Sequence, residues 1–207
     1  MGRPARDMYL IADTGSDVSW TQCRPCIDCY NQSDPIYDPL ASTTYKDLPC
    51  NSGECNALVS VGGWRLPIPP YLLELGRNGR GGVIVDSGTA VTRFPRKVYR
   101  VLRDAFVGMA TGLPRAAVGF SLFDTCYDLS GVRRVSVPTV SFEFAGGGTL
   151  RLPAANYMVP VDGRGKFCFA FAGMEGTMSI IGNVQQQGTR VVYDVANRRI
   201  AFSPNKC

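Results

Sequence analysis

Apolar and polar residues alternate in short runs along most of this 207-residue chain, which predicts a fold built mainly of β-strands. The runs are interrupted by 23 glycines and 14 prolines, so we expect frequent turns. Strands are predicted at residues 8–12, 18–20, 83–85, Ser60–Leu66, Val135–Phe144, Thr149–Leu152, Tyr157–Val161 and Phe167–Phe171, with a closing hairpin of Arg190–Asp194 and Arg199–Phe202. Ile180-Ile181-Gly182 is an apolar pair closed by glycine.

One segment follows the period of a helix instead. It starts near Pro95, a residue suited to the first helical turn, and ends before Gly112. Its apolar residues share one face: Val98, Val101, Leu102, Ala105, Phe106 and Met109. A shorter helical turn is predicted at Asn183–Gly188. We expect the phenylalanines of Phe167–Phe171 to occupy alternate strand positions rather than to form a binding platform.

Composition indicates a globular chain, with 45% apolar and 19% charged residues, arranged as one large domain or two small lobes. No apolar run approaches the roughly 20 residues of a membrane span. The densest basic group, Arg93 to Arg103, lies on the predicted helix and favours a solvated helix face, with an anionic partner as the alternative. Histidine is absent, which excludes Ser-His-Asp and Cys-His catalysis and histidine-rich metal sites.

Eight cysteines favour an oxidising compartment, so we expect a secreted or extracellular protein. The N-terminal MGRPARDMYL nevertheless has no apolar core of a signal peptide, and we interpret the sequence as a mature protein without its leader. Asn31-Gln32-Ser33 matches a glycosylation sequon, which predicts an exposed loop with Asn31 as the acceptor.

Three cysteines, Cys23, Cys26 and Cys29, are spaced like the thiolates of a metal site. A fourth ligand at suitable spacing is missing and the surroundings are rich in proline, so disulfides are favoured over a metal. We therefore expect neither a metal nor a cofactor.

Two short stretches of the chain repeat each other: Asp13-Thr14-Gly15-Ser16 and Asp86-Ser87-Gly88-Thr89. Each follows an apolar run that reads as a buried strand, so each places an acid on a tight turn. One Asp-Ser/Thr-Gly sequence is ordinary turn chemistry. Two of them, each closed by a second hydroxyl residue, indicate a two-fold site with one carboxylate from each half.

Two carboxylates on facing turns would share one proton, because like charges about 3 Å apart do not both ionise cheaply. The ionised acid could then activate a water while the protonated acid polarises a carbonyl. Around Asp13 and Asp86, Thr14 and Ser87 are suited to brace one turn against the other. Ser16 and Thr89 are suited to bond the outer carboxylate oxygens, and Gly15 and Gly88 let backbone N–H groups approach.

Three stretches of the chain resemble the pepsin-like aspartic proteases: DTGSDVSWTQC, DSGTAVTRFP and the late Ser179–Asn183. The run C-x-x-C-x-x-C followed by YNQSDPIYDP resembles their plant nepenthesin-like branch. The resemblance implies a mainly β fold of two lobes with the active site between them. It also implies an endopeptidase that uses Asp13 and Asp86 on peptide or protein substrates, without a cofactor. We expect a monomer with no nucleic-acid or membrane partner.

The chain departs from the family pattern in its first half. Only 72 residues separate Asp13 from Asp86, too few for a complete first lobe. No flap motif of the Y-x-D-G-S type lies between Cys55 and Asp86, and no apolar-apolar-glycine segment supports Asp13 as Ile180-Ile181-Gly182 supports Asp86. We therefore expect a partial N-terminal lobe at residues 1–58 and a near-complete C-terminal lobe at residues 59–207, the product of truncation or alternative splicing.

The resemblance also implies two disulfides, Cys23 with Cys26 and Cys126 with Cys168. It leaves Cys29, Cys50, Cys55 and Cys207 without assigned partners. Two functional hypotheses follow. The chain is an acid-optimum aspartic endopeptidase, or it is a catalytically impaired relative that acts as a binding or inhibitor-like protein.

Overall fold

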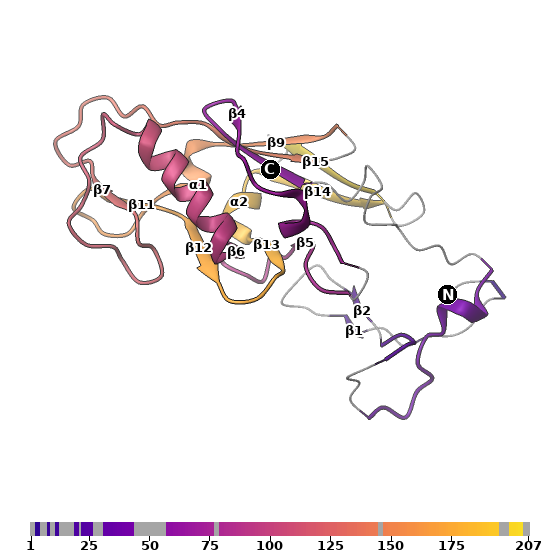
Figure 1. Cartoon of the computed structure of the whole chain (residues 1–207). Coiled ribbons are helices and arrows are strands. Elements are labelled where there is room, and N and C mark those ends of the chain that lie inside the picture. Colours follow the sequence, from indigo (N-terminus) through magenta and orange to yellow (C-terminus); the bar gives the residue numbers. More distant parts are fainter. Residues whose placement is uncertain are drawn as a thin grey trace. The chain divides into compact units, whose positions relative to one another are not determined.

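The computed structural model describes residues 3–4, 8, 11–12, 19–20, 22–26, 31–43, 57–76, 79–144, 147–194 and 199–204. The chain divides into two compact units, Met1–Leu48 and Pro49–Cys207. Figure 1 labels the elements of both units and colours them by their position in the sequence.

Short elements make up the described part of the first unit. Strand β1 (Ile11–Ala12) pairs antiparallel with β2 (Ser19–Trp20), as the apolar runs predicted. A 3₁₀ turn covers Pro39–Ala41, and the side chain of Asp38 caps it by accepting a 3.0 Å hydrogen bond from the Leu40 N–H. The capping carboxylate satisfies one of the backbone donors that open such a turn.

In the second unit, a four-stranded antiparallel sheet has the order β4-β3-β8-β9. Its strands are β3 (Ala57–Val61), β4 (Trp64–Arg65), β8 (Val140–Phe144) and β9 (Thr149–Leu152). The predicted single strand Ser60–Leu66 is thus a hairpin, because Gly62 and Gly63 adopt φ of +60° and +82° and reverse the chain between β3 and β4. The predicted strand Val135–Phe144 pairs only from Val140, since Pro138 has no N–H to give to a ladder.

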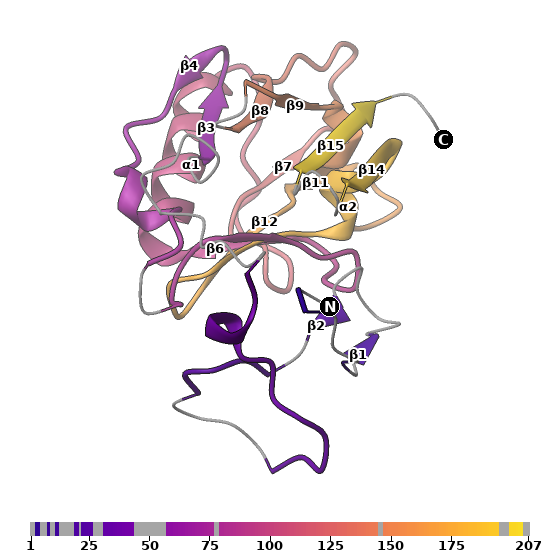
Figure 2. The same cartoon turned by 90° about the vertical axis from the view of Figure 1, so that its right-hand side faces the viewer.

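A second sheet combines parallel and antiparallel neighbours in the order β12-β6-β13-β5. Its strands are β5 (Val83–Val85), β6 (Thr92–Pro95), β12 (Phe171–Met174) and β13 (Ser179–Ile181). The parallel pairs are β13 with β5 and β12 with β6. Figure 2 shows β6 and β12 beneath the β4-β3-β8-β9 sheet.

Two further groups of strands complete the second unit. The order β10-β11-β7 joins β10 (Met158–Pro160), β11 (Lys166–Phe169) and β7 (Cys126–Asp128), and the predicted closing hairpin forms from β14 (Thr189–Asp194) and β15 (Arg199–Pro204). The predicted strand Phe167–Phe171 is divided, since β11 and β12 belong to different sheets and Ala170 donates its N–H to the Tyr157 carbonyl between them.

Helix α1 (Arg96–Met109) covers β6 and β12, as Figure 1 shows. Of its predicted apolar face, Val98, Leu102 and Phe106 are buried, Val101 and Ala105 are half-buried, and Met109 at the end of the helix is exposed. The phenyl ring of Phe106 stacks on Phe169 at 4.1 Å. Full burial of a side chain of this size stabilises the fold by roughly 1.5–3 kcal/mol. The core is therefore built where α1 meets the sheets, and both Phe169 and Phe171 lie inside it rather than on a binding surface.

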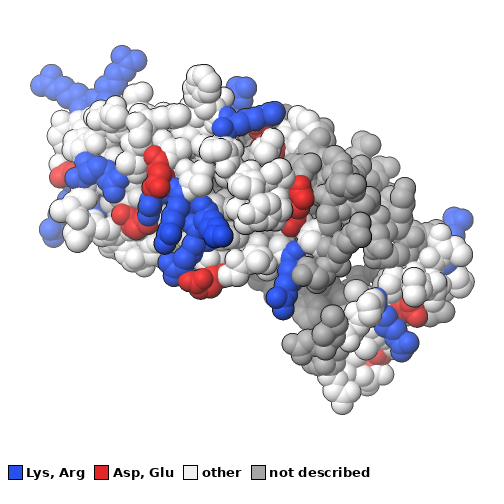
Figure 3. Space-filling model, in the orientation of Figure 1, with Lys and Arg blue, Asp and Glu red and all other residues white. Residues whose placement is uncertain are grey.

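The outer face of α1 carries the basic group that the sequence singled out. Figure 3 shows blue and red side chains interleaved there, and the ion pairs include Arg96 with Glu175 and Arg103 with Asp104 and Asp124. Mixed charge of this kind is typical of a solvated surface. Among the helices in the described part of the chain, none is both long enough and apolar enough to cross a bilayer.

Candidate functional site

The Asp86 turn begins where strand β5 ends, at the buried Val85. The Asp86 N–H donates a 3.0 Å hydrogen bond to the carbonyl of Ile181, the last residue of the parallel strand β13. The backbone of the acid is therefore fixed by a strand that lies almost a hundred positions later in the sequence.

The carboxylate of Asp86 is held by its own turn. The Gly88 N–H donates to Oδ1 at 2.8 Å, and the Thr89 hydroxyl donates to Oδ2 at 2.6 Å. An ionised carboxylate has about four acceptor positions, so these two bonds orient the group and leave others free. Asp86, Ser87 and Thr89 are half-buried and Gly88 is exposed, which leaves the group within reach of solvent.

A second segment braces this turn from behind. The Gly182 N–H donates to the Thr92 hydroxyl at 3.1 Å, and the N–H of Asn183 donates to the Thr89 carbonyl at 2.7 Å. A Cβ atom on Gly182 would overlap the backbone of Val91, so only glycine fits at this crossing. The predicted support of Asp86 by Ile180-Ile181-Gly182 is present in the structure.

Sequence reasoning missed the buried amide of Gln185, in the short helix α2 (Asn183–Gln186). Its Oε1 accepts the Thr92 N–H at 2.7 Å, and its Nε2 donates to the carbonyls of Asn156 (2.7 Å) and Ala170 (2.9 Å). One side chain thus joins the strand after the Asp86 turn to two other segments. A glutamine in a predicted helical turn is expected to be exposed to solvent, and the only sequence signal was its position three residues after Gly182.

The other half of the predicted site, Asp13-Thr14-Gly15-Ser16, lies outside the described residues. The pairing of Asp13 with Asp86 therefore stays a prediction. Strands β1 and β2, which flank this turn in the sequence, do pair with each other.

The predicted cysteine pairs have different outcomes. Cys126 and Cys168 form a disulfide between directly opposed positions of β7 and β11. The pairing of Cys23 with Cys26 is wrong: Cys23 is a free, exposed thiol, bridged through its backbone to Tyr37, while Cys26 is disulfide-bonded. Because a cysteine can form only one disulfide, and the other described pair is Cys126 with Cys168, the partner of Cys26 lies outside the described residues.

The predicted glycosylation site, Asn31, is exposed on the first unit. Within the described part of the chain, no three cysteine or acidic side chains lie close enough together to hold a metal ion. The described half of the site therefore consists of one oriented carboxylate and its hydrogen-bond donors.

The chain was compared with known protein families. A family profile described as Xylanase inhibitor C-terminal matches residues 57–204, and one described as Xylanase inhibitor N-terminal matches residues 1–65. The two matches together extend over almost the whole chain and meet at β3 and β4.

Curated relatives match along the entire chain. Aspartyl protease family protein 2 of Arabidopsis thaliana is 34% identical over 339 aligned positions, which cover all of this chain and 70% of the relative. Nepenthesin-1 of Nepenthes gracilis, an aspartic proteinase, is 26% identical and 76% covered. Since this chain has 207 residues, it is truncated relative to these proteins, and many aligned positions face a gap in it.

Solved structures show the same fold. The structure titled edgp matches with a TM-score of 0.64 and 19% identity over 73% of this chain, which spans 38% of that chain. Conglutin gamma from lupine seeds matches with a TM-score of 0.58 and 20% identity over 72% of this chain and 36% of its own.

Proposed function

Since the chain belongs to the pepsin-like aspartic protease family, in its plant nepenthesin-like branch, we propose that it is an endopeptidase that activates a water molecule between Asp13 and Asp86. The observation that supports the proposal most directly is the oriented carboxylate of Asp86, held by the Gly88 N–H and the Thr89 hydroxyl. A hydrolase of this type has to fix its acid relative to the scissile bond before substrate binds.

In this proposal the two acids share one proton, because two carboxylates at close distance do not both ionise. The ionised member takes a proton from the water, and the protonated member donates to the substrate carbonyl. The Thr89 hydroxyl donates to Oδ2 of Asp86, which in this proposal is the outer oxygen, and by the repeat of the two turns Ser16 would do the same for Asp13. Thr14 and Ser87 would brace the turns, while Gly15 would offer its N–H as Gly88 does.

The test is cleavage of denatured globin at acid pH, with and without a statine-type inhibitor. Asp86→Asn and Asp13→Asn should each reduce cleavage to background, because a single acid cannot supply both proton transfers. Asp104→Asn is the matched control, since Asp104 is an exposed acid on α1 that contacts only Arg103 in the described structure. Folded wild-type protein without inhibitor-sensitive cleavage would refute the proposal.

A second candidate is a binding or inhibitor-like role without catalysis. Two observations favour it: the matching family profiles are described as xylanase inhibitor domains, and the chain is shorter than its protease relatives. The discriminating measurement is the inhibition of a xylanase by the folded protein. Inhibition that persists in Asp86→Asn, in a chain without proteolytic activity, would establish this role.

The remaining assignments belong to the same proposal. We infer a secreted monomer that acts on peptides or proteins, without nucleic-acid or membrane partners, glycosylated at Asn31. The partial N-terminal lobe would comprise residues 1–58 and the C-terminal lobe residues 59–207. Exposure of Asn31 and the disulfide between Cys126 and Cys168 support an oxidising compartment.

A further inference from the structure

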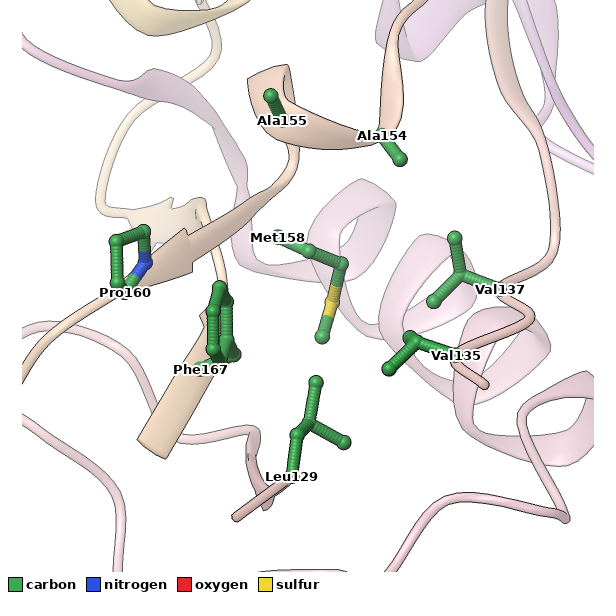
Figure 4. Close-up of a pocket in the computed structure, with 8 residues that line it drawn as sticks. All are labelled: Leu129, Val135, Val137, Ala154, Ala155, Met158, Pro160 and Phe167. Atoms are coloured by element: carbon green, nitrogen blue, oxygen red, sulfur yellow. The ribbon is translucent and has the colours of Figure 1, made fainter. Parts of the chain in front are cut away.

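An apolar pocket of about 430 Å³ opens on the second unit, within the range of roughly 300–1,000 Å³ that small-molecule sites occupy. Buried or half-buried Leu129, Met158 and Phe167 form its floor, and the more exposed Val135 and Ala155 lie at its rim. Figure 4 shows the Met158 thioether pointing into the space that these residues enclose. None of the lining residues belongs to the Asp86 turn or to the segment that braces it.

Two arginines lie in the segment that joins two lining residues of this pocket. Leu129 and Val135 both line it, and Arg133 and Arg134 immediately precede Val135 in the chain. Both side chains are exposed, and neither forms an ion pair with any residue that the structure describes. Two cations therefore adjoin a rim residue of the pocket in sequence, and their charge suggests the charge of a ligand.

The neighbouring acids do not neutralise these arginines. Asp128 and Lys166 are opposed in register between β7 and β11, so they share the sheet face opposite to that of Phe167. Asp162, two residues after the lining residue Pro160, uses its Oδ1 to accept the N–H groups of Arg164 and Lys166, at 2.9 and 3.0 Å. The Asp162 carboxylate is therefore occupied by its own turn, and it forms no ion pair with Arg133 or Arg134.

We propose that this pocket binds an amphipathic anion, with an apolar body against Met158 and one carboxylate directed to Arg133 and Arg134. The apolar lining excludes a highly polar ligand, because burying unpaired polar groups is costly. Guanidinium groups bind carboxylates through two parallel hydrogen bonds, which fixes the orientation of the ligand. The site is lined by residues outside the Asp86 turn, so its occupation does not require the Asp86 carboxylate.

Decanoate is the probe, and the protein is labelled with ¹³C at the methyl groups of its six methionines. Decanoate should shift the Met158 methyl signal in a saturable way and leave the exposed Met109 and Met178 unchanged. Met158→Leu assigns the signal. Equal shifts at all three methionines would show adsorption to the surface and would overturn the proposal, as would no shift in protein with a dispersed, folded spectrum.

Charge and shape are tested separately. The double variant Arg133→Gln/Arg134→Gln should raise the Kd for decanoate about tenfold, as loss of one charge-assisted hydrogen bond predicts. The matched control Arg93→Gln/Arg100→Gln removes two other exposed arginines and should bind as the wild type does. Ala155→Trp, at an exposed rim position, should block the pocket.

The head group decides the chemistry of the ligand. Decyltrimethylammonium has the same chain with a positive charge and should bind at least tenfold more weakly than decanoate. Equal affinity for the two probes, or an unchanged Kd in the Arg133/Arg134 double variant, would refute an anion site.

Discussion

At the scale of single residues, the Asp86 turn depends on residues that lie outside its own motif. Gly182 lets two backbone segments cross, and Gln185 satisfies a donor and two acceptors inside the unit. Motif reasoning found the acid and its hydroxyl, because these have a fixed spacing in sequence. It missed Gln185, because the partners of a buried amide are set by tertiary packing.

Gly182→Ala should destabilise the protein by about 1–3 kcal/mol, since the added methyl group overlaps a backbone that cannot rotate away. The measurement is the urea midpoint of unfolding at constant slope. Gly112→Ala is the control, because no atom lies within 4 Å of a Cβ at that position. Equal midpoints for the two variants would contradict the crowding at Gly182.

Gln185→Ala should cost about 3 kcal/mol, since it leaves the Thr92 N–H and the carbonyls of Asn156 and Ala170 without their partner. Gln187→Ala removes an exposed amide close by in sequence and should change the midpoint by less than about 0.5 kcal/mol. Retained stability in Gln185→Ala would show that water replaces the amide.

At the scale of elements, helix α1 is tethered to the segment before β7 by a polar cluster. The Tyr99 hydroxyl donates to Asp124 at 2.5 Å, and Arg103 and Thr125 donate to the same carboxylate at 2.9 and 2.8 Å. Burial alone would raise the pKa of Asp124, but these hydrogen bonds outweigh it and hold the pKa below its ordinary value. Burial and the nearby carboxylate raise the pKa of Tyr99, so the phenol remains a donor.

A lowered folded-state pKa means that Asp124 stabilises the protein above its unfolded-state pKa, near 3.8, and that this contribution is lost as pH falls through the folded-state value. Asp124→Asn should therefore lower the melting temperature at pH 6 and converge with the wild type at the acid end of the titration. Asp104→Asn serves as the control, because it removes an exposed acid of helix α1 that pairs with the same Arg103. A constant difference at every pH would exclude ionisation of Asp124 as the cause.

The elements also show what sequence pattern can predict. Alternation located most strands, and the apolar face of α1 located the helix, because both signals are local. Pattern did not predict that Ser60–Leu66 turns back on itself, nor that Phe167–Phe171 leaves one sheet for another. Pairing partners are determined by packing between distant segments, so the sheets and their strand orders could not be derived from local periodicity.

At the scale of the molecule, all described groups that support Asp86 belong to one unit, Pro49–Cys207. The repeat of the two Asp turns supplied both carboxylates from the sequence. The resemblance to a family supplied the expectation of two lobes and the Cys126–Cys168 pair. The same resemblance misassigned Cys23. The family resemblance thus predicted the disulfide of the second unit correctly and the disulfide of the first unit wrongly.

Residues 49–207 expressed alone should fold cooperatively, because this unit has its own core and disulfide. The fragment should keep the dispersed methyl spectrum of the full chain and show no inhibitor-sensitive cleavage, since it lacks Asp13. Inhibitor-sensitive cleavage by the fragment would mean that Asp86 does not need Asp13. Loss of a cooperative melting transition would show that the first unit is required for folding.

The parallel pairing of β5 with β13 also has a kinetic consequence. Ile84 is in register with Ile180, so the loop closed by this contact contains much of the second unit. Closing this loop costs conformational entropy before the strand pairing can stabilise the fold. Contacts of such long sequence separation slow folding. During synthesis, the carboxylate of Asp86 leaves the ribosome long before the strand that fixes its backbone. The nascent chain therefore carries an unsupported acid until translation has passed Gly182, and assembly of this half-site is a late step in folding.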